Sequence, residues 1–189
     1  IGRLAFRQMF GAEGFEIVAI NDLTSPKMLA HLLKYDSTQG KYALADTVTA
    51  GEDSITVDGK EIKIYAKANA AELPWGEIGV DVVLECTGFY TSKDKAQAHI
   101  DAGAKHVIIS APAGNDLKTI VYNVNHETLT KEDHIISAAS CLYNGSEFTN
   151  FATIIDAKSV GVQMLPSHNS TGFSALTIVS LSFAAYTPI

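Results

Sequence analysis

Short runs rich in Ile and Val recur along most of this 189-residue chain, and helix-forming segments lie between them. Such nearly continuous apolar runs are typical of parallel strands that are covered on both faces. Strands that alternate with helices predict an α/β fold built on a parallel sheet. The expected strands are FEIVAIND (15–22), VDVVLECTG (80–88), HVIISA (106–111), TIVYNVN (119–125) and HIISAAS (134–140).

Three segments have a helical pattern, and one dipeptide predicts a hairpin. The first, residues 1–10, has the apolar residues Leu4, Phe6, Met9 and Phe10. The second, residues 25–35, starts at a possible Ser25 cap and has an apolar face of Met28, Leu29, Leu32 and Leu33. The third, residues 92–103, runs from Ser92 to Gly103. Asp58-Gly59 lies between alternating segments, which is a strong hairpin signal. The chain starts with Ile inside a helical pattern, so we expect a segment before it.

Small and polar residues follow four of the expected strands. In an open parallel sheet, ligands bind beyond the carboxyl ends of the strands, so this edge is the expected binding site. The residues found there are Asn21-Asp22, Thr87-Gly88, Ser110 to Pro112 and Ser140-Cys141.

One spacing within this set points to a dinucleotide. Asp22 follows Gly2 by twenty residues, which is the offset of the acid that binds the adenosine ribose in a dinucleotide fold. On spacing alone, a solvated acid at a strand end is an equal alternative.

The composition excludes several classes of function. A net charge of −7 with only two arginines, Arg3 and Arg7, argues against nucleic-acid binding. We expect no membrane span, because the chain contains no apolar run long enough for one. We expect no secretory leader, because the chain contains no charged segment followed by an apolar run of the kind that marks one. Two cysteines, Cys86 and Cys141, are too few for a disulfide framework, which favours a reducing cytoplasm.

Residues 1–141 closely resemble bacterial glyceraldehyde-3-phosphate dehydrogenases of the glycolytic type. The resemblance rests on IGRLAFR, VAINDLT, MLAHLLKYDSTQGKY, the long stretch ECTGFYTSKDKAQAHIDAGAKHVIISAPAGNDLKTIVYNVNH, and ISAASC. It implies an NAD-binding Rossmann domain over 1–140, truncated before its first strand and phosphate-cradling loop. Residues 141–189 would then begin a catalytic domain.

The same resemblance implies the cofactor site. Ile1 and Gly2 correspond to the end of the pyrophosphate loop. Asp22 corresponds to the ribose acid and favours NAD over NADP, because its charge would meet a 2′-phosphate. Thr87, Gly88 and Ser110 correspond to residues that line the cofactor cleft. No metal is implied.

The catalytic residues implied by the resemblance lie near the end of the chain. Cys141 corresponds to the nucleophile, which forms a thiohemiacetal and then a thioester that phosphate cleaves. His168 follows Cys141 by twenty-seven residues, which is the family's spacing for the catalytic base. Ser140 and Thr171 correspond to substrate-binding residues. Cys86, inside an apolar strand, is interpreted as a structural thiol.

The resemblance weakens after Cys141. The family reads SCTTNC where this chain reads SCLYNG, and only Glu147, Asp156 and Lys158 are charged beyond this point. Three explanations stay open: an uncertain sequence for a true family segment, genuine divergence, or a foreign extension beginning near GSEF (145–148). The preserved His168 spacing favours the first, and the alternative for His168 is a surface histidine in unrelated sequence.

The implied function is the NAD-dependent, phosphorylating oxidation of glyceraldehyde 3-phosphate. The implied partners are that aldehyde, inorganic phosphate and identical subunits in a homotetramer. Two alternatives remain: a related aldehyde-phosphate dehydrogenase, such as one acting on erythrose 4-phosphate, and a non-enzymatic fragment that binds a dinucleotide or a partner protein.

Overall fold

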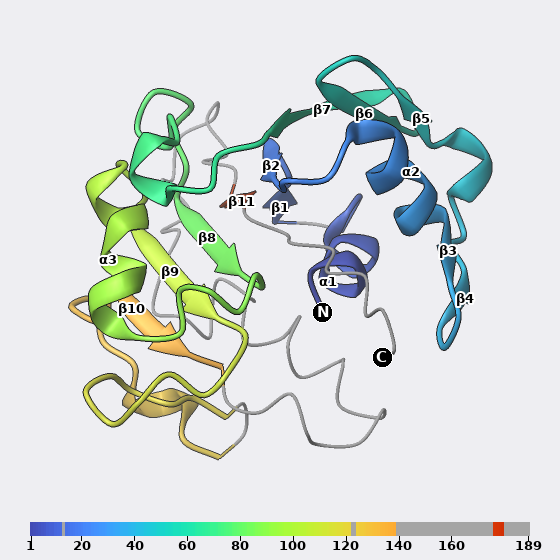
Figure 1. Cartoon of the computed structure of the whole chain (residues 1–189). Helices are drawn as coiled ribbons and strands as arrows, with labels where there is room; N and C mark the ends of the chain where they lie inside the picture. The colour runs from blue at the N-terminus through green and yellow to red at the C-terminus, as the bar shows by residue number, and fades with distance from the viewer. Residues whose placement is uncertain (13, 122–123, 139–175, 180–189) are drawn as a thin grey trace, which may run out of the picture.

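A five-stranded parallel sheet forms the centre of the molecule (Figure 1). The computed structural model describes residues 1–12, 14–121 and 124–138, and the backbone of 176–179. The strand order is β1-β11-β8-β9-β10, and every neighbouring pair is parallel. These strands are β1 (Phe15–Glu16), β8 (Val82–Glu85), β9 (His106–Ile109), β10 (Ile135–Ser137) and β11 (Leu176–Val179). The predicted α/β fold with a parallel sheet is confirmed.

Both faces of this sheet are buried, because its side chains alternate between two apolar clusters. In β8, Val82 and Leu84 face the cluster that contains Phe6 and Leu29, whereas Val83 faces the cluster around Trp75. Helix α1 (Gly2–Met9) contributes to the first cluster and helix α3 (Lys93–Asp101) to the second. This two-sided burial explains why the strands are apolar at consecutive positions.

A second sheet has the order β2-β7-β6-β5. Its strands are β2 (Ala19–Asn21), β5 (Thr49–Ala50), β6 (Ser54–Val57) and β7 (Lys60–Tyr65). The predicted hairpin joins β6 to β7, and both Asp58 (φ 47°) and Gly59 (φ 79°) have the positive φ that a tight hairpin turn requires.

The expected strand over 15–22 is divided between the two sheets. β1 pairs with β11 in the first sheet, and β2 pairs with β7 in the second. The chain therefore changes hydrogen-bonding partner across Ile17 and Val18, and the prediction of one continuous strand is wrong.

The helices begin at the predicted caps. Helix α2 (Pro26–Lys34) starts after Ser25, whose hydroxyl accepts from the amide of Met28 at 3.4 Å, and Ser92 accepts from the amide of Lys95 at the same distance. One expectation for α2 is wrong: Met28 is 48% exposed, and the buried positions are Leu29, Ala30 and Leu33.

The two arginines bind carbonyl groups at the end of α2. Arg7 donates from Nε and Nη2 to the carbonyl of Leu33 at 3.1 and 2.7 Å, and from Nη1 to that of Gly40 at 3.1 Å. Arg3 donates to the carbonyl of Leu32 at 2.9 Å and pairs with Asp36 at 3.0 Å. The last carbonyls of a helix lack partners within it and carry partial negative charge. These arginines therefore join α1 to α2 and to the short hairpin β3 (Tyr35–Asp36) and β4 (Gly40–Lys41).

The expected strand over 119–125 does not form in the described residues. Thr119 makes a single parallel bridge to Ser137, and a 3₁₀ turn follows at His126–Thr128. The Asn125 side chain accepts from the amide of Val121 at 2.7 Å and donates to the carbonyl of Thr119 at 2.9 Å. Such a local bond occupies the backbone groups that a neighbouring strand would need. Two further 3₁₀ turns lie at Ala45–Thr47 and Ala70–Glu72.

Candidate cofactor site at the carboxyl ends of the strands

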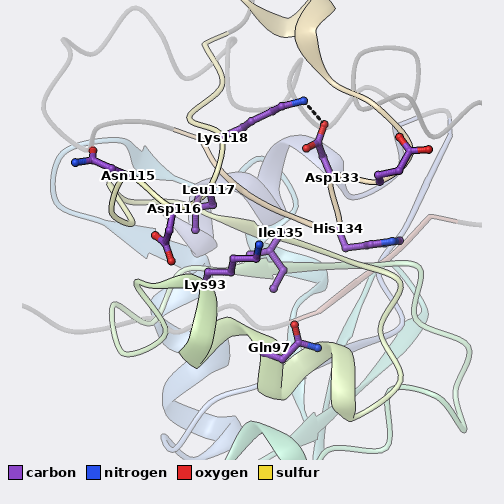
Figure 2. A pocket seen from close by; sticks show the side chains of 10 residues that line it. Lys93, Gln97, Asn115, Asp116, Leu117, Lys118, Asp133, His134 and Ile135 are labelled. Carbon is purple, nitrogen blue, oxygen red and sulfur yellow. Dashed lines mark hydrogen bonds and ion pairs between the residues drawn. The ribbon is translucent and has the colours of Figure 1, made fainter.

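A hollow of about 480 Å³ flanks β10 and the first turns of α3 (Figure 2). Its wall carries both signs of charge, and Lys118 is paired with Asp133 across 2.6 Å. Of the residues that the sequence assigns to the binding site, none in the described part of the chain lines it. The candidate site therefore lies at the strand ends.

The ends of β8 and β9 bring three of the expected residues together. The amide of Ser110 donates to the carbonyl of Glu85 at 2.9 Å, which sets Ser110 beside the segment that contains Thr87 and Gly88. Thr87 is partly buried and Gly88 is exposed. The first turn after β8 therefore presents a hydroxyl and an open backbone at this edge.

Asp22 follows β2 and is buried, with an exposed fraction of only 4%. Its Oδ1 accepts from the amide of Thr24 at 2.7 Å, and its own amide donates to the carbonyl of Tyr65 at 2.9 Å. The interpretation of Asp22 as a solvated surface acid is therefore wrong. Asp22 is instead fixed in a turn beyond the strand, and the next residue, Leu23, is 63% exposed.

Ile1 and Gly2 lie at the start of α1, where Gly2 is buried and Ile1 is the residue before the helix. Phe6 of α1 and Cys86, the residue that follows β8, belong to the same apolar cluster. Helix α1, which begins at Gly2, therefore packs on the face of the sheet that this cluster covers.

Cys86 has the properties of a structural thiol. Burial raises the pKa of this thiol to about 12, although a hydrogen bond with Ser110 acts in the opposite direction. A thiol with so high a pKa is a poor nucleophile at neutral pH, because the thiolate is the reactive form. Cys86 therefore lies near the candidate site without the properties of a catalytic residue.

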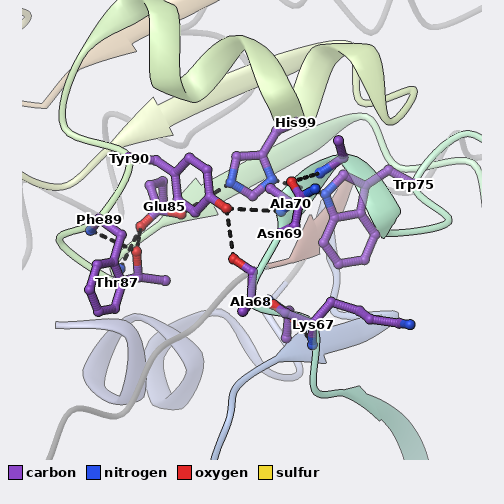
Figure 3. A network of polar contacts seen from close by, with 12 residues as sticks. Lys67, Ala68, Asn69, Ala70, Trp75, Glu85, Thr87, Phe89, Tyr90 and His99 are labelled. Carbon is purple, nitrogen blue, oxygen red and sulfur yellow. Dashed lines mark hydrogen bonds and ion pairs between the residues drawn. The ribbon is translucent and has the colours of Figure 1, made fainter.

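A buried polar network supports the turn after β8 (Figure 3). Glu85 and His99 are 1% and 0% exposed, and their side chains are joined by a hydrogen bond of 3.1 Å. Trp75 donates to the other ring nitrogen of His99 at 3.1 Å. The sequence patterns do not predict this network. Its one signal is the acid that ends the otherwise apolar run VDVVLE.

The remaining expected residues lie outside the described part of the chain. They are Ser140, Cys141, His168 and Thr171. Among the described residues, no group of three or more His, Cys, Asp and Glu side chains is arranged to hold a metal ion. No helix in the same residues is long and apolar enough to cross a membrane.

Comparison with known proteins finds a family model that matches the first part of the chain. Residues 1–93 match the family model described as glyceraldehyde 3-phosphate dehydrogenase, NAD binding domain. These residues are therefore similar to the NAD-binding domain of glyceraldehyde-3-phosphate dehydrogenases. This match confirms the expected Rossmann-type NAD-binding domain and the expected cofactor, NAD.

Curated glyceraldehyde-3-phosphate dehydrogenases match beyond this region. The enzyme of Clostridium pasteurianum is 59% identical over 144 residues, covering 76% of this chain and 42% of its own length. That of Lactobacillus delbrueckii subsp. bulgaricus is 62% identical over 149 residues, covering 76% and 44%. That of Lactococcus lactis subsp. lactis is 47% identical over 178 residues, covering 91% and 51%. The chain thus spans about half or less of the length of these relatives.

Proposed function

We propose that the protein is an NAD-dependent, phosphorylating aldehyde dehydrogenase that oxidises glyceraldehyde 3-phosphate to 1,3-bisphosphoglycerate. The observation that carries the proposal is the 62% identity to a glyceraldehyde-3-phosphate dehydrogenase over 149 residues. Residues 1–140 would form the cofactor domain, to whose sheet residues 176–179 add β11, and the rest of residues 141–189 would begin the catalytic domain. We further propose a cytoplasmic homotetramer, as the resemblance implies.

The described residues fit NAD at the carboxyl ends of the strands. The Asp22 carboxylate offers an acceptor for ribose hydroxyls at the end of β2, and Thr87, Gly88 and Ser110 offer polar and backbone groups at the ends of β8 and β9. Exposed apolar side chains follow both regions, since Leu23 is 63% and Phe89 is 70% exposed. A planar base requires apolar surface of this kind beside its polar contacts. Ile1 and Gly2 would approach the pyrophosphate.

The proposed chemistry begins with the Cys141 thiolate. Its attack on the aldehyde carbon forms a thiohemiacetal whose oxygen takes a proton from protonated His168, and His168 takes that proton back as hydride leaves the same carbon. NAD, when bound, accepts that hydride. Inorganic phosphate then displaces Cys141 from the resulting thioester, while Ser140 and Thr171 bind the phosphate groups. The Lactococcus lactis match supports this assignment, because an alignment covering 91% of the chain includes both Cys141 and His168.

A direct assay tests the proposed function. With glyceraldehyde 3-phosphate, phosphate and NAD, we expect NADH to form, as measured at 340 nm, and Cys141→Ser to abolish it. Cys86→Ser is the matched control and should retain the rate, because the Cys86 thiol is un-ionised at neutral pH. NADH formation with erythrose 4-phosphate instead would favour the related dehydrogenase. NAD binding without turnover of either aldehyde would favour the non-enzymatic alternative, and absence of NAD binding would contradict the proposal.

A second prediction concerns the choice of cofactor. Asp22 should exclude NADP, because its buried carboxylate would face the 2′-phosphate while accepting from the ribose hydroxyls of NAD. We expect Asp22→Ala to weaken NAD binding. The preference for NAD over NADP should fall by about tenfold or more, which is the effect of one charge-assisted hydrogen bond. Titration calorimetry with both dinucleotides measures the ratio. Equal affinity of the unmodified protein for NADP and NAD would contradict this role, and Asp46→Ala, at an exposed acid, is the control.

A further inference from the structure

We propose that Glu85 is a positioning residue for the cofactor: its buried carboxylate fixes the Thr87 turn, and a neutral His99 held by Trp75 fixes the carboxylate. The proposal rests on the proposed NAD site, and it adds to that site a residue that touches no ligand. The side chains involved are drawn together in Figure 3.

One oxygen of Glu85 determines the conformation of Thr87. Glu85 Oε1 accepts from the amide of Thr87 at 2.6 Å and also from the Thr87 hydroxyl. That hydroxyl accepts in turn from the amide of Phe89 at 3.0 Å. A single carboxylate oxygen therefore fixes both the backbone and the side-chain rotamer of Thr87, and through it the direction of the chain past Gly88.

The indole of Trp75 determines which ring nitrogen of His99 carries the proton, and so how His99 binds the other oxygen of Glu85. The indole nitrogen of Trp75 can only donate, so His99 Nδ1, at 3.1 Å, must accept. The ring proton then lies on Nε2, which donates to Glu85 Oε2 at 3.1 Å. His99 is therefore neutral in this arrangement. Its ring is packed at 6.5 Å from that of Trp75 and at 5.0 Å from that of Tyr90, measured between centroids.

Tyr90 extends the network to the strand end that carries Asp22. Its hydroxyl accepts from the amide of Ala70 and donates to the carbonyl of Ala68, both at 2.9 Å. In the same segment, Lys67 exchanges two backbone hydrogen bonds of 2.9 Å with the Asn21 side chain, directly before Asp22. The two strand ends of the proposed NAD site are thus supported by one set of contacts.

The chemistry of this network distinguishes positioning from packing. A buried carboxylate carries a desolvation cost, and an apolar side chain of similar volume often stabilises a core equally well. Both oxygens of Glu85 are nevertheless used by groups of defined donor direction, and two of the three donors belong to Thr87. The arrangement therefore specifies the shape of the turn at the cofactor edge.

The isosteric variant Glu85→Gln tests the proposal, because an amide has only one oxygen and cannot accept hydrogen bonds from both Thr87 and His99. With its oxygen toward Thr87, its NH₂ group faces the Nε2 proton of His99; reversed, the NH₂ group faces the Thr87 amide. We expect NAD affinity, measured by calorimetry, to fall about tenfold, the effect of one misplaced buried hydrogen bond. The far-UV circular dichroism should stay unchanged. Asp81→Asn, at an acid preceding β8 that pairs with Lys105, is the control and should leave the affinity unchanged.

A second substitution provides a rescue that a purely structural role would not produce. In Glu85→Gln with Trp75→Phe, His99 is no longer required to accept at Nδ1, so its proton can move there and Nε2 can accept from the new amide. The amide oxygen then returns to Thr87. We expect the double variant to regain NAD affinity relative to Glu85→Gln while losing stability, and ¹⁵N NMR of the imidazole to report the changed tautomer.

The outcomes separate this inference from the proposed function. If the unmodified chain binds no NAD, the proposed function fails, while the Thr87 and Phe89 amide shifts still report whether Glu85→Gln changes the turn. Unchanged NAD affinity and unchanged amide shifts in Glu85→Gln would overturn the inference. If Glu85→Gln does not fold, His99→Gln and His99→Phe test the bond that holds the other oxygen of Glu85. The Gln variant keeps an N–H donor and should bind NAD, the Phe variant should bind about tenfold more weakly, and equal affinities would overturn the inference.

Discussion

Brief treatment of the native protein with iodoacetamide at neutral pH should label Cys141 and leave Cys86 unmodified. Burial raises the pKa of the Cys86 thiol to about 12. At pH 7 such a thiol is ionised in about one molecule in 10⁵, against about 3% for an ordinary thiol with a pKa near 8.5. Cys86 should therefore react about three-thousandfold more slowly than an ordinary cysteine, and a Cys141 activated by His168 should react faster than an ordinary cysteine.

Peptide mass spectrometry over a time course measures both rates in one sample. The protein unfolded in urea is the control, and there the two cysteines should react at similar rates, since the burial of Cys86 is lost. The rate of Cys86 labelling in the folded protein should rise about tenfold for each pH unit between 7 and 10. The pKa of the thiol lies above this range, so the fraction of reactive thiolate rises by that factor. Labelling of Cys86 before Cys141 would contradict the assignment of Cys141 as the nucleophile.

The substitution Gly103→Ala should strongly destabilise the domain. Gly103 follows α3 with a φ of +102°, and a Cβ there would overlap the backbone of Gly76. This contact cannot be relieved by a rotamer change, because it involves main-chain atoms that are fixed by the hydrogen bond from the Gly76 amide to the carbonyl of Ala102. An unfavourable φ and an overpacked contact each cost about 1–3 kcal/mol, so we expect a loss of about 3–5 kcal/mol.

Urea denaturation of Gly103→Ala and Gly79→Ala separates the two contributions. Gly79 also has a positive φ, +71°, but a Cβ there would meet no atom within 4 Å. Gly79→Ala should therefore show the backbone cost alone, about 1 kcal/mol. Equal losses in the two variants would show that the close approach of Gly76 and Gly103 has no energetic effect.

The features that were predictable from sequence depend on local physical chemistry. The Asp58-Gly59 turn and the Ser25 and Ser92 caps are specified by residues within a few positions of each other. The division of residues 15–22 between two sheets was not predictable, because it depends on which strands supply partners from distant parts of the chain. In the described residues of 119–125, the expected strand is replaced by local hydrogen bonds from the side chain of Asn125, which competes for the backbone.

The candidate site was predictable to the extent that it depends on strand ends. Thr87, Gly88 and Ser110 lie together because β8 and β9 are adjacent and parallel. The network behind them was not predictable, since His99 occupies a helix position that sequence alone assigns to either surface or core. Its contacts with Glu85 and Trp75 depend on how α3 packs on the sheet.

The position of β11 has a consequence for the order in which the domain acquires its structure. Figure 1 shows this short strand between β1 and β8, and its register joins Phe15 to Leu176 at nearly opposite ends of the chain. Until residues 176–179 arrive, the facing edges of β1 and β8 have no strand between them. Pairings between such distant segments form slowly, and unpaired strand edges are sites of aggregation. During synthesis β11 leaves the ribosome after both β1 and β8, and a chaperone that shields the two edges should raise the yield of folded protein.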